Sequence, residues 1–310
     1  LNALLASEVM RYEVIENELV EIKEKYADER RTRIIKMATE FNPEDMYADD
    51  DMVITISHLG YIKRTPLADF RQQGRGGVGA KASAARDEDF IEYVHQANMH
   101  STMMFFTEQG RLYWTKVYEL PEGNRQSKGR ALQNMINIQK GDKVCAFIHV
   151  KNLSDMEYVQ NHYLIFATKN GLMKKTTLEA YSRPRANGII ALGLREDDRL
   201  IRVTLTDGNS QMLVASYNGK VVRFPEDTVR PMGRTATGVR AIKLDEDGKD
   251  RVIGMICVEE GSKESVLVIS EKGFGKRTDL DDENGEPIYR ITNRGGKGVK
   301  TMNLTDKTGN

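Results

Sequence analysis

The chain has 310 residues, of which 39% are hydrophobic and 30% are charged, a composition typical of a soluble globular protein with room for more than one domain. No apolar run approaches the roughly 20 residues that a membrane-spanning helix needs, and no signal peptide is present at the start, so we expect a cytoplasmic protein with no membrane partner. The 46 Lys and Arg residues balance 46 Asp and Glu residues, so nucleic-acid binding would require local clusters of cations.

The two cysteines, Cys145 and Cys257, each lie in an apolar run, at 144–150 and 252–258. Free cysteine is among the most buried residue types, so we expect two buried thiols in strands, which suits a reducing cytoplasm. The spacing of histidines and cysteines matches no pattern of metal ligands, so the sequence predicts no metal site.

The first 40 residues have the pattern of an amphipathic helix, with apolar side chains recurring at steps of three and four. These side chains belong to Leu5, Val9, Tyr12, Ile15, Leu19, Ile22 and Tyr26. The stripe resembles that of a coiled coil, so we expect residues 1–40 to be either a helix packed on its own domain or the end of a longer arm. The acidic stretch 41–51, which contains Pro43, is predicted to be a linker.

From residue 52 to residue 310 the chain repeats a hairpin signal, in which two strand-like runs flank a turn that contains glycine. The turn glycines are Gly60, Gly110, Gly171, Gly219 and Gly273. A second glycine follows each turn and precedes an apolar run, and these second glycines are Gly79, Gly129, Gly188, Gly238 and Gly298. The period is about 50 residues, which is typical of propeller folds with four short strands in each unit.

The sequence therefore predicts an all-β, propeller-like fold of about five units over residues 52–310, preceded by the amphipathic helix. Residues 299–304 are predicted to open the first strand of a sixth unit. Helical solenoids are disfavoured because the repeats lack long stretches of 3.6-residue period. A β-sandwich with turns of coincidental spacing is the remaining alternative, and the five agreeing turns argue against it.

Positive charge recurs at one phase of the repeat. The residue four after each turn glycine is Arg64, Trp114, Lys175, Arg223 or Arg277, and in three units a lysine precedes it, at Lys63, Lys174 and Lys276. The segments around the second glycines add Arg71, Arg75, Lys128, Arg130, Arg183, Arg185, Arg234, Arg240, Arg294 and Lys297. One charged run is usually a solvated face, but equivalent residues of a closed ring would share one rim. Such a belt predicts binding and bending of a phosphate backbone without recognition of base sequence.

The stretch 72–79 is the richest in glycine and reads Gln-Gln-Gly-Arg-Gly-Gly-Val-Gly. Its glycines would allow several backbone N–H groups, together with Arg75, to approach one phosphate, although such a loop is more often a tight connection. The sequence contains no convincing catalytic set. Its five histidines are scattered, paired carboxylates such as Asp281 and Asp282 lie in loops, and no P-loop is present, so we expect no ATP hydrolysis by this chain.

Segments 28–32, 53–63, 116–121 and 219–224, together with 73–79, carry a resemblance to a known family. The first segment is similar to the end of the breakage-reunion domain in the A subunit of bacterial DNA gyrase, a type IIA topoisomerase. The second resembles the first strand pair of the C-terminal DNA-wrapping domain in the same family. The resemblance covers essentially the whole chain.

The residues that align with the family's gyrase box, Gln-Arg-Arg-Gly-Gly-Lys-Gly, are Gln73, Gly74, Arg75, Gly76, Gly77, Val78 and Gly79. Gly74 and Val78 replace an arginine and a lysine, so two cationic contacts are missing. The segment 294–298 in the fifth unit is closer to the core of the box. In the family the box region helps to fasten the first and last blades, which leaves open whether this chain closes into a ring.

The resemblance implies a six-bladed β-pinwheel, a relative of the propeller whose blades are joined by strand exchange. It implies a non-catalytic domain that binds double-stranded DNA and wraps it around its rim with positive handedness. In the family, a holoenzyme of two A and two B subunits introduces negative supercoils with ATP and Mg bound on the B subunits, and the nucleophilic tyrosine lies upstream of this region. The expected partners are therefore duplex DNA, the gyrase B subunits and a second copy of the A subunit, with no cofactor in this chain and a nucleoid-associated location.

Two other functions stay open. The nearest is the equivalent domain of topoisomerase IV, whose box is typically degenerate or lost, although the retained Gln-x-Arg-Gly-Gly-x-Gly pattern favours gyrase. The other is a propeller that serves as a protein-interaction platform, which would need a rim dominated by apolar or aromatic side chains. Trp114 alone breaks the cationic series, so the platform is the weaker alternative.

Overall fold

The computed structural model describes residues 2–29, 31–32, 42–70, 75, 88–246 and 248–309. It divides into two compact units, Leu1–Pro43 and Glu44–Asn310. The first unit contains the helices α1 (Asn2–Ala6) and α2 (Glu8–Tyr26), and every strand among the described residues belongs to the second. None of the helices in these described ranges is long and apolar enough to cross a membrane.

The N-terminal helix is shorter than predicted and is interrupted near its start. Ser7 has an extended backbone and its hydroxyl accepts a hydrogen bond from Met10 N–H (3.4 Å), so it caps α2 and separates it from α1. The helix ends at Tyr26, and Ala27 is again extended. The apolar stripe is exposed from Leu5 to Tyr26, so none of the described residues of the first unit buries it.

The second unit contains four four-stranded antiparallel sheets, which we call blades 1 to 4, and one two-stranded hairpin. Blade 1 has the order β3 (Ile91–Asn98), β1 (Asp51–Ser57), β2 (Tyr61–Pro66) and β6 (Arg130–Ala131). Blade 2 has the order β7 (Val144–Val150), β4 (Thr102–Thr107), β5 (Arg111–Lys116) and β10 (Ile189–Ile190). Blade 3 has the order β11 (Leu200–Thr206), β8 (Tyr163–Thr168), β9 (Leu172–Thr177) and β14 (Val239–Arg240).

Blade 4 has the order β15 (Val252–Glu259), β12 (Ser210–Ser216), β13 (Lys220–Pro225) and β18 (Val299–Lys300). The hairpin of the fifth unit consists of β16 (Ser265–Ile269) and β17 (Gly275–Asp279). One α-helix, α3 (Met156–Asn161), precedes β8. The short 3-10 helices are η1 (Pro43–Met46), η2 (Leu67–Asp69), η3 (Val117–Glu119), η4 (Leu132–Asn134), η5 (Leu178–Tyr181) and η6 (Glu226–Thr228).

The outermost strand of each blade comes from the next unit of the repeat. β6, β10, β14 and β18 follow the hairpins of the next units in the chain, yet they pair with β2, β5, β9 and β13. We call these four the exchanged strands, and the segments that lead to them, 120–129, 182–188, 229–238 and 290–298, the exchange loops. The prediction that residues 299–304 open a sixth unit is wrong for Val299 and Lys300, which complete blade 4.

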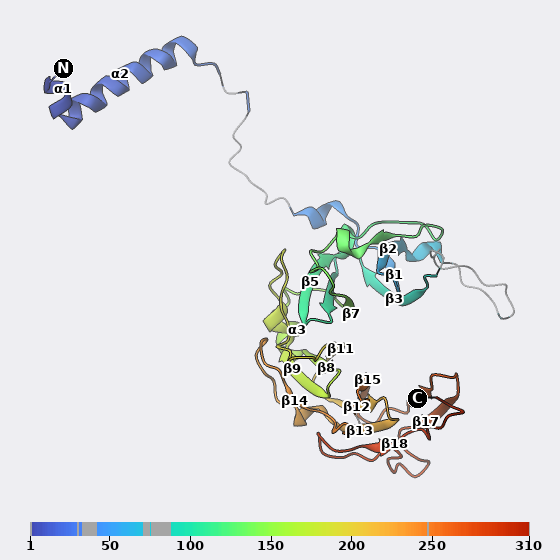
Figure 1. Cartoon of the computed structure of the whole chain (residues 1–310). Coiled ribbons are helices and arrows are strands. Elements are labelled where there is room, and N and C mark those ends of the chain that lie inside the picture. The colour runs from blue at the N-terminus through green and yellow to red at the C-terminus, as the bar shows by residue number, and fades with distance from the viewer. Residues whose placement is uncertain are drawn as a thin grey trace. The chain divides into compact units, whose positions relative to one another are not determined.

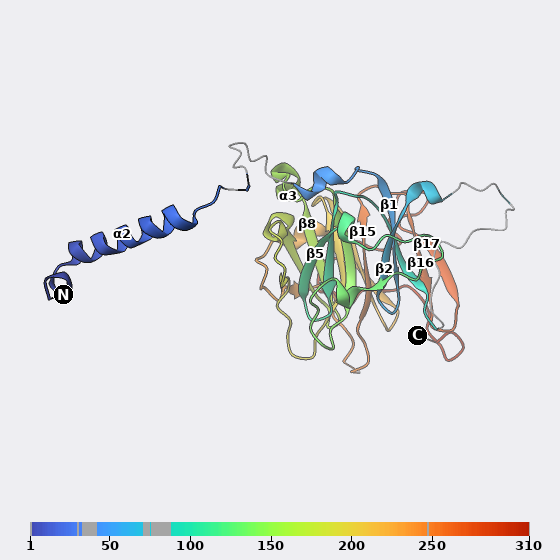
Figure 2. The same cartoon turned by 90° about the horizontal axis from the view of Figure 1, so that it is seen from above.

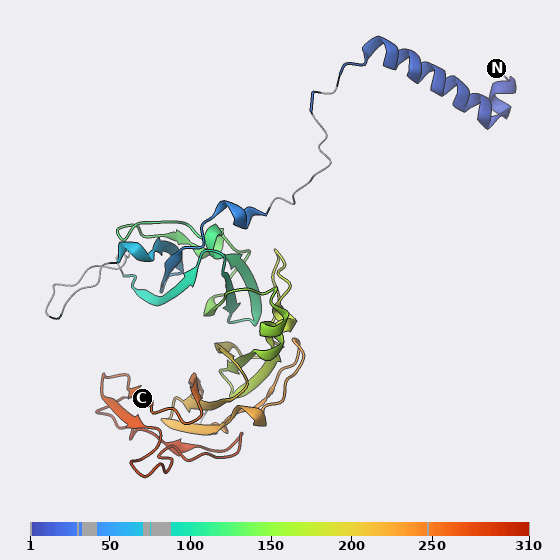
Figure 3. The same ribbon diagram turned by 180° about the vertical axis from the view of Figure 1, so that it is seen from behind.

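Within the second unit the blades follow one another around an arc, with β11 and β15 on its inner side and β14 and β18 on its outer side (Figure 1). The strands of each blade stand roughly upright in the view from above (Figure 2), and the view from behind shows the same succession (Figure 3). Neighbouring blades touch through their inner strands, since β11 contacts both β7 and β15. The exchanged strands therefore form the outer rim.

The hydrophobic core lies between successive blades. In β4, Met103 and Phe105 belong to the core between blades 1 and 2, whereas Met104 and Phe106 belong to the core between blades 2 and 3. Phe106 meets Phe166 of blade 3 edge to face, with ring centroids 5.6 Å apart. Because side chains alternate along a strand and both faces are covered, the central strands read as continuous apolar runs.

The hairpin turns are held by carboxylates that sequence reasoning missed. Each accepts a hydrogen bond from the backbone N–H just before a turn glycine, at 2.9–3.1 Å, and they are Asp89, Asp142, Asp198 and Asp250. The carbonyl of the turn glycine accepts a bond from the residue after the exchanged strand, as from Leu132 N–H to Gly60 (2.9 Å) and from Thr301 N–H to Gly219 (2.9 Å). The turn glycines therefore mark the points where exchanged strands are anchored.

Residues 44–47, from the predicted linker, are part of the second unit and pack against blade 2. The Tyr47 ring stacks on Tyr118 at 4.8 Å, and the Tyr47 carbonyl lies 2.8 Å from Nε2 of His100. Glu44 forms an ion pair with Lys116. These contacts attach the start of the second unit to blade 2.

Candidate nucleic-acid interface

Most of the cationic series that follows the turn glycines lies inside the molecule. The exposed fractions are 1% for Lys63, 7% for Arg64, 0% for Lys174, 5% for Lys175 and 5% for Arg223. The prediction that these five side chains belong to an exposed belt is therefore wrong. Both faces of their strands are covered by neighbouring structure, so the alternation of side chains places them between units and not on the rim. Lys276 and Arg277, on β17, are exposed.

Arg64 binds the segment that crosses from blade 2 to blade 1. Its Nη1 donates to the carbonyls of Val117 (3.3 Å), Tyr118 and Leu120 (2.5 Å), and its Nη2 donates to the Glu122 carboxylate (2.9 Å). A buried guanidinium is tolerated only where such partners replace water. Arg64 therefore fastens the start of the first exchange loop, and its burial keeps the guanidinium away from a phosphate at the surface.

Lys175 and Arg223, farther along the chain, also join neighbouring units. Lys175 Nζ lies 2.7 Å from the carboxylate of Glu226, whose side chain is fully buried, so this ion pair joins blade 3 to the 3-10 helix after blade 4's hairpin. Arg223 donates to Gln211 Oε1 (2.6 Å) and to Asp281 (2.9 Å), which joins blade 4 to the fifth unit. The repeated cations thus hold consecutive units together.

Exposed cations gather instead on the exchange loops and exchanged strands. Of the predicted DNA-binding residues on these segments, the exposed ones are Lys128, Arg130, Arg183, Arg185, Arg240 and Lys297, and the half-buried ones are Arg234 and Arg294. The same segments contain four cations that sequence reasoning missed, Arg125, Arg230, Arg290 and Lys300. We call all of these the rim cations. In the described part of the chain, no ion pair involves any of them, so their charge is available to an anionic partner.

A repeated arginine could have revealed this arrangement from the sequence. The residue four before the second glycine is Arg75, Arg125, Arg234 or Arg294, and only the third unit departs, with Pro184. In the exchange loops Arg125, Arg234 and Arg294 each begin a tight turn. The positions of the surface cations within the repeat are therefore found by counting from the second glycine and not from the turn glycine.

The second glycines are required by close backbone contact. Their φ angles are positive, at 76° for Gly129, 66° for Gly188, 93° for Gly238 and 76° for Gly298. A Cβ atom at these positions would lie only 2.3–2.7 Å from a carbonyl oxygen of the preceding blade's outer hairpin strand. Glycine alone combines this conformation with this approach, so each second glycine lets an exchanged strand lie against its host blade.

Consecutive exchange segments are also bonded to one another. Gly193, which follows β10, donates its N–H to Ala236 O in the next exchange loop (3.3 Å). Ala241, which follows β14, accepts a bond from Gly295 N–H in the last exchange loop (2.7 Å). We call each exchange loop, together with its exchanged strand and the residues that follow directly, an exchange segment. The exchange segments of blades 2, 3 and 4 therefore form one continuous strip. We call the exchange segments of all four blades the rim band.

Other predicted residues fall largely outside the described part of the chain. These are Arg71, Gln73, Gly74, Gly76, Gly77, Val78 and Gly79. Arg75 is described and is exposed.

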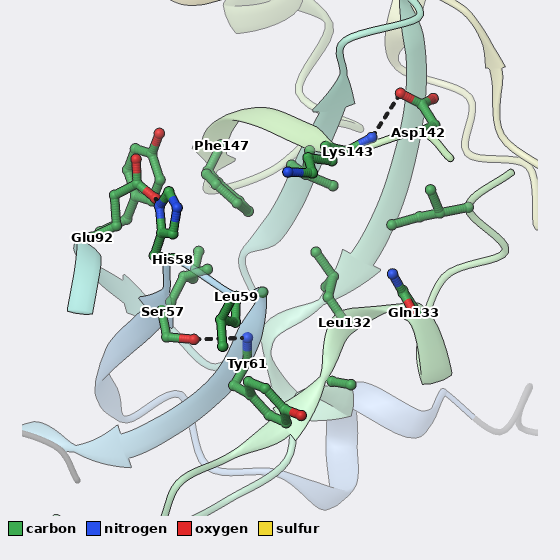
Figure 4. Close-up of a pocket in the computed structure, with 16 residues that line it drawn as sticks. Ser57, His58, Leu59, Tyr61, Glu92, Leu132, Gln133, Asp142, Lys143 and Phe147 are labelled. Carbon is green, nitrogen blue, oxygen red and sulfur yellow. Dashed lines mark hydrogen bonds and ion pairs between the residues drawn. The ribbon is translucent and has the colours of Figure 1, made fainter. Parts of the chain in front are cut away.

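A cavity of about 270 Å³ lies between blades 1 and 2 (Figure 4). In its wall, His58 Nδ1 lies 3.0 Å from Glu92 Oε2, whereas the Ser57 hydroxyl accepts a bond from Tyr61 N–H (3.0 Å). Among the described residues no hydrogen bond joins Ser57 to the His58 ring, so the cavity shows no paired nucleophile and base. Over the same residues, no three His, Cys, Asp or Glu side chains are grouped so that they could hold a metal ion.

Comparison with known proteins identifies the repeated units. The model of the family described as "DNA gyrase C-terminal domain, beta-propeller" matches residues 51–98, 101–151, 162–207, 211–259 and 264–309. The A subunit of DNA gyrase from Staphylococcus epidermidis is 42% identical over 311 residues, and that from Staphylococcus aureus is 41% identical. Both alignments cover 100% of this chain and 34% of the relative, so the chain spans about one third of the length of these relatives.

Two solved structures share the architecture. The crystal structure of the C-terminal domain of DNA topoisomerase IV matches with a TM-score of 0.66 and 26% identity, over 82% of this chain and 73% of that one. The structure of a DNA gyrase A C-terminal domain matches with a TM-score of 0.63 and 22% identity, over 84% of this chain and 80% of that one. The second likeness, at this identity, concerns the fold alone.

Proposed function

The chain belongs to the DNA gyrase C-terminal domain family, and we propose that it is a non-catalytic domain that binds duplex DNA along the rim band and wraps it. The observation that carries the proposal is the recurrence, on successive exchange segments, of rim cations that form no ion pair within the described ranges. A duplex carries one negative charge per roughly 1.7 Å of its axis, so a continuous cationic strip on a curved surface attracts and bends it.

The rim band is suited to the phosphate backbone more than to base edges. Its cations lie on short loops and on two-residue strands, as Arg130, Arg240 and Lys300 do on β6, β14 and β18. Within the described segments, no long helix or ribbon projects from it to enter a major groove. Contacts of this kind position DNA without reading its sequence, so unrelated duplexes of equal length should bind with similar affinity.

The proposal extends to the complete enzyme. As a part of the gyrase A subunit, the domain would act with a second copy of that subunit and two B subunits, with ATP and Mg on the B subunits. Wrapping with positive handedness would present a second segment of the same DNA for passage, which favours negative supercoiling. A cytoplasmic location on the nucleoid follows from the DNA partner.

Duplex binding by a triple variant tests the interface. Replacing Arg130, Arg240 and Lys300 by Ala removes one exposed cation from three exchanged strands. Each lost phosphate contact lowers the slope of log affinity against log salt by about 0.9, so we expect a slope lower by about 2–3. The matched control replaces three exposed lysines outside the rim band, Lys140, Lys151 and Lys263. Equal slopes for both variants would contradict the interface.

Wrapping itself is tested by ligation of nicked circular DNA in the presence of the purified chain, followed by removal of protein and measurement of linking number. A positive shift relative to naked DNA, reduced in the rim variant, is expected. Binding without any shift would contradict wrapping by this chain and would favour a role like that of the topoisomerase IV domain.

A further inference from the structure

Two lysines at equivalent positions bury their ammonium groups against backbone carbonyls. Lys63 Nζ donates to Asn124 O (2.8 Å) and Ser127 O (3.0 Å). Lys174 Nζ donates to Ala191 O (2.5 Å) and Arg234 O (2.6 Å). Each lysine is three residues after a turn glycine, on β2 or β9, and no ion pair within the described ranges includes either of them.

The carbonyls that these lysines bind belong largely to the exchange loops. Asn124 O and Ser127 O bracket the turn that begins at Arg125, and one acceptor of Lys174 is the carbonyl of Arg234 itself. A buried ammonium needs these acceptors because water is excluded, so it holds the carbonyls inward. The lysine thereby fixes the backbone of the turn that carries a half-buried arginine, Arg125 or Arg234.

The other described blades lack this lysine. The equivalent residue is Tyr113 in blade 2 and Val222 in blade 4, and both are buried. The exchange loop of blade 4 is held by other contacts, including Arg294 Nη1 to Arg240 O (3.0 Å) and Thr292 N–H to Arg223 O (2.8 Å). The lysine is therefore not required for strand exchange as such, and the blade 4 loop serves as an internal reference.

We propose that Lys63 and Lys174 are positioning residues for DNA, which never touch it but fix the turns that present Arg125 and Arg234 to the phosphate backbone. This inference rests on the proposed function of the rim band. The lysine acts through the arginine. Replacing the lysine should therefore leave the arginine side chain in the protein but abolish the contact of that arginine with DNA.

Lys174→Met removes the ammonium while keeping a long apolar side chain. We expect faster backbone hydrogen exchange in segment 230–238 with unchanged exchange in 290–298, and weaker duplex binding with a salt slope lower by about 1, as for Arg234→Ala. In a chain that already carries Arg234→Ala, Lys174→Met should cause no further loss of affinity. If Lys174→Met does not fold, Lys63→Met with Arg125→Ala makes the same test in blade 1.

The outcomes separate the two proposals. Unchanged hydrogen exchange in 230–238 would overturn the positioning role, whatever the affinity. Faster exchange with full affinity would also overturn it, provided that the rim triple variant binds DNA less well than its control. Full affinity in the lysine, arginine and rim variants alike would instead overturn the rim band as the DNA surface. Equal loss of affinity for Lys174→Met with and without Arg234→Ala would show that the lysine acts by another route.

Discussion

Gly238→Ala tests whether close contact at the second glycine holds an exchanged strand in place. A residue with a Cβ atom at the Gly238 φ of 93° costs about 1–2 kcal/mol. The added Cβ would lie 2.3 Å from Met173 O, whereas nonbonded atoms pack at roughly 3.5 Å, so β14 must move outward by about 1 Å. That shift weakens the β14–β9 pairing and the Ala241 N–H to Gly171 O bond (2.8 Å). With about 1 kcal/mol for each hydrogen bond, the expected total is about 3–5 kcal/mol.

Equilibrium unfolding in urea measures this loss, with Gly261→Ala as the control. Gly261 also has a positive φ, 76°, but no atom lies within 4 Å of its ideal Cβ position. Its substitution should therefore cost only the conformational part, about 1–2 kcal/mol. Equal losses of unfolding free energy in the two variants would refute the argument that close backbone approach is why glycine is needed at Gly238.

Three further results are expected. Arg64→Met should lower the free energy of unfolding by about 3 kcal/mol because it leaves buried carbonyls unpaired. Glu122→Gln changes an exposed partner of Arg64 and should lower the free energy of unfolding by less than about 1 kcal/mol. Similar losses for the two variants would contradict the structural role of Arg64. Burial lowers the pKa of Lys174 to about 7, so the unfolded chain binds more protons above that pH. The stability of the parent chain relative to Lys174→Met should therefore rise by about 1.4 kcal/mol per pH unit between about pH 7 and 10, and a difference independent of pH would show that folding does not lower the pKa of Lys174. Burial raises the pKa of Cys145 and raises that of Cys257 to about 12, so both half-buried thiols should react with a thiol reagent more slowly in the native chain than after unfolding, and equal rates would contradict this.

The repeat was predictable because its signals are local. A turn glycine, a second glycine and the apolar runs around them recur in each unit, and each signal depends on the conformation of a few neighbouring residues. The two cysteines lie in strands as expected, at Cys145 in β7 and Cys257 in β15, but both are half-buried and not buried as predicted. The first-unit helix was predicted from its stripe, although the break at Ser7 depended on a hydrogen bond that the Ser7 hydroxyl accepts from Met10 N–H, which periodicity does not detect.

The surface was not predictable in the same way. Lys63, Arg64 and Arg130 all appear in the sequence as repeated cations, yet the first two are buried and only the third is exposed. The difference arises because β6 leaves its own unit and pairs with β2 of the preceding one. A pairing between residues far apart in the chain leaves no local pattern, so neither the covered faces nor the outer rim could be assigned from periodicity.

The amino-acid sequence by itself thus determined a five-fold repeat of β-hairpins. Each unit has a turn glycine and a second glycine at similar positions, and cations lie close to both glycines in the sequence. Tertiary structure alone decided which cations hold the units together and which face the solvent. The physical reason is that a charge in a strand covered on both sides must find partners within the protein, while the same charge on an exchanged segment remains in water and available to an anionic partner.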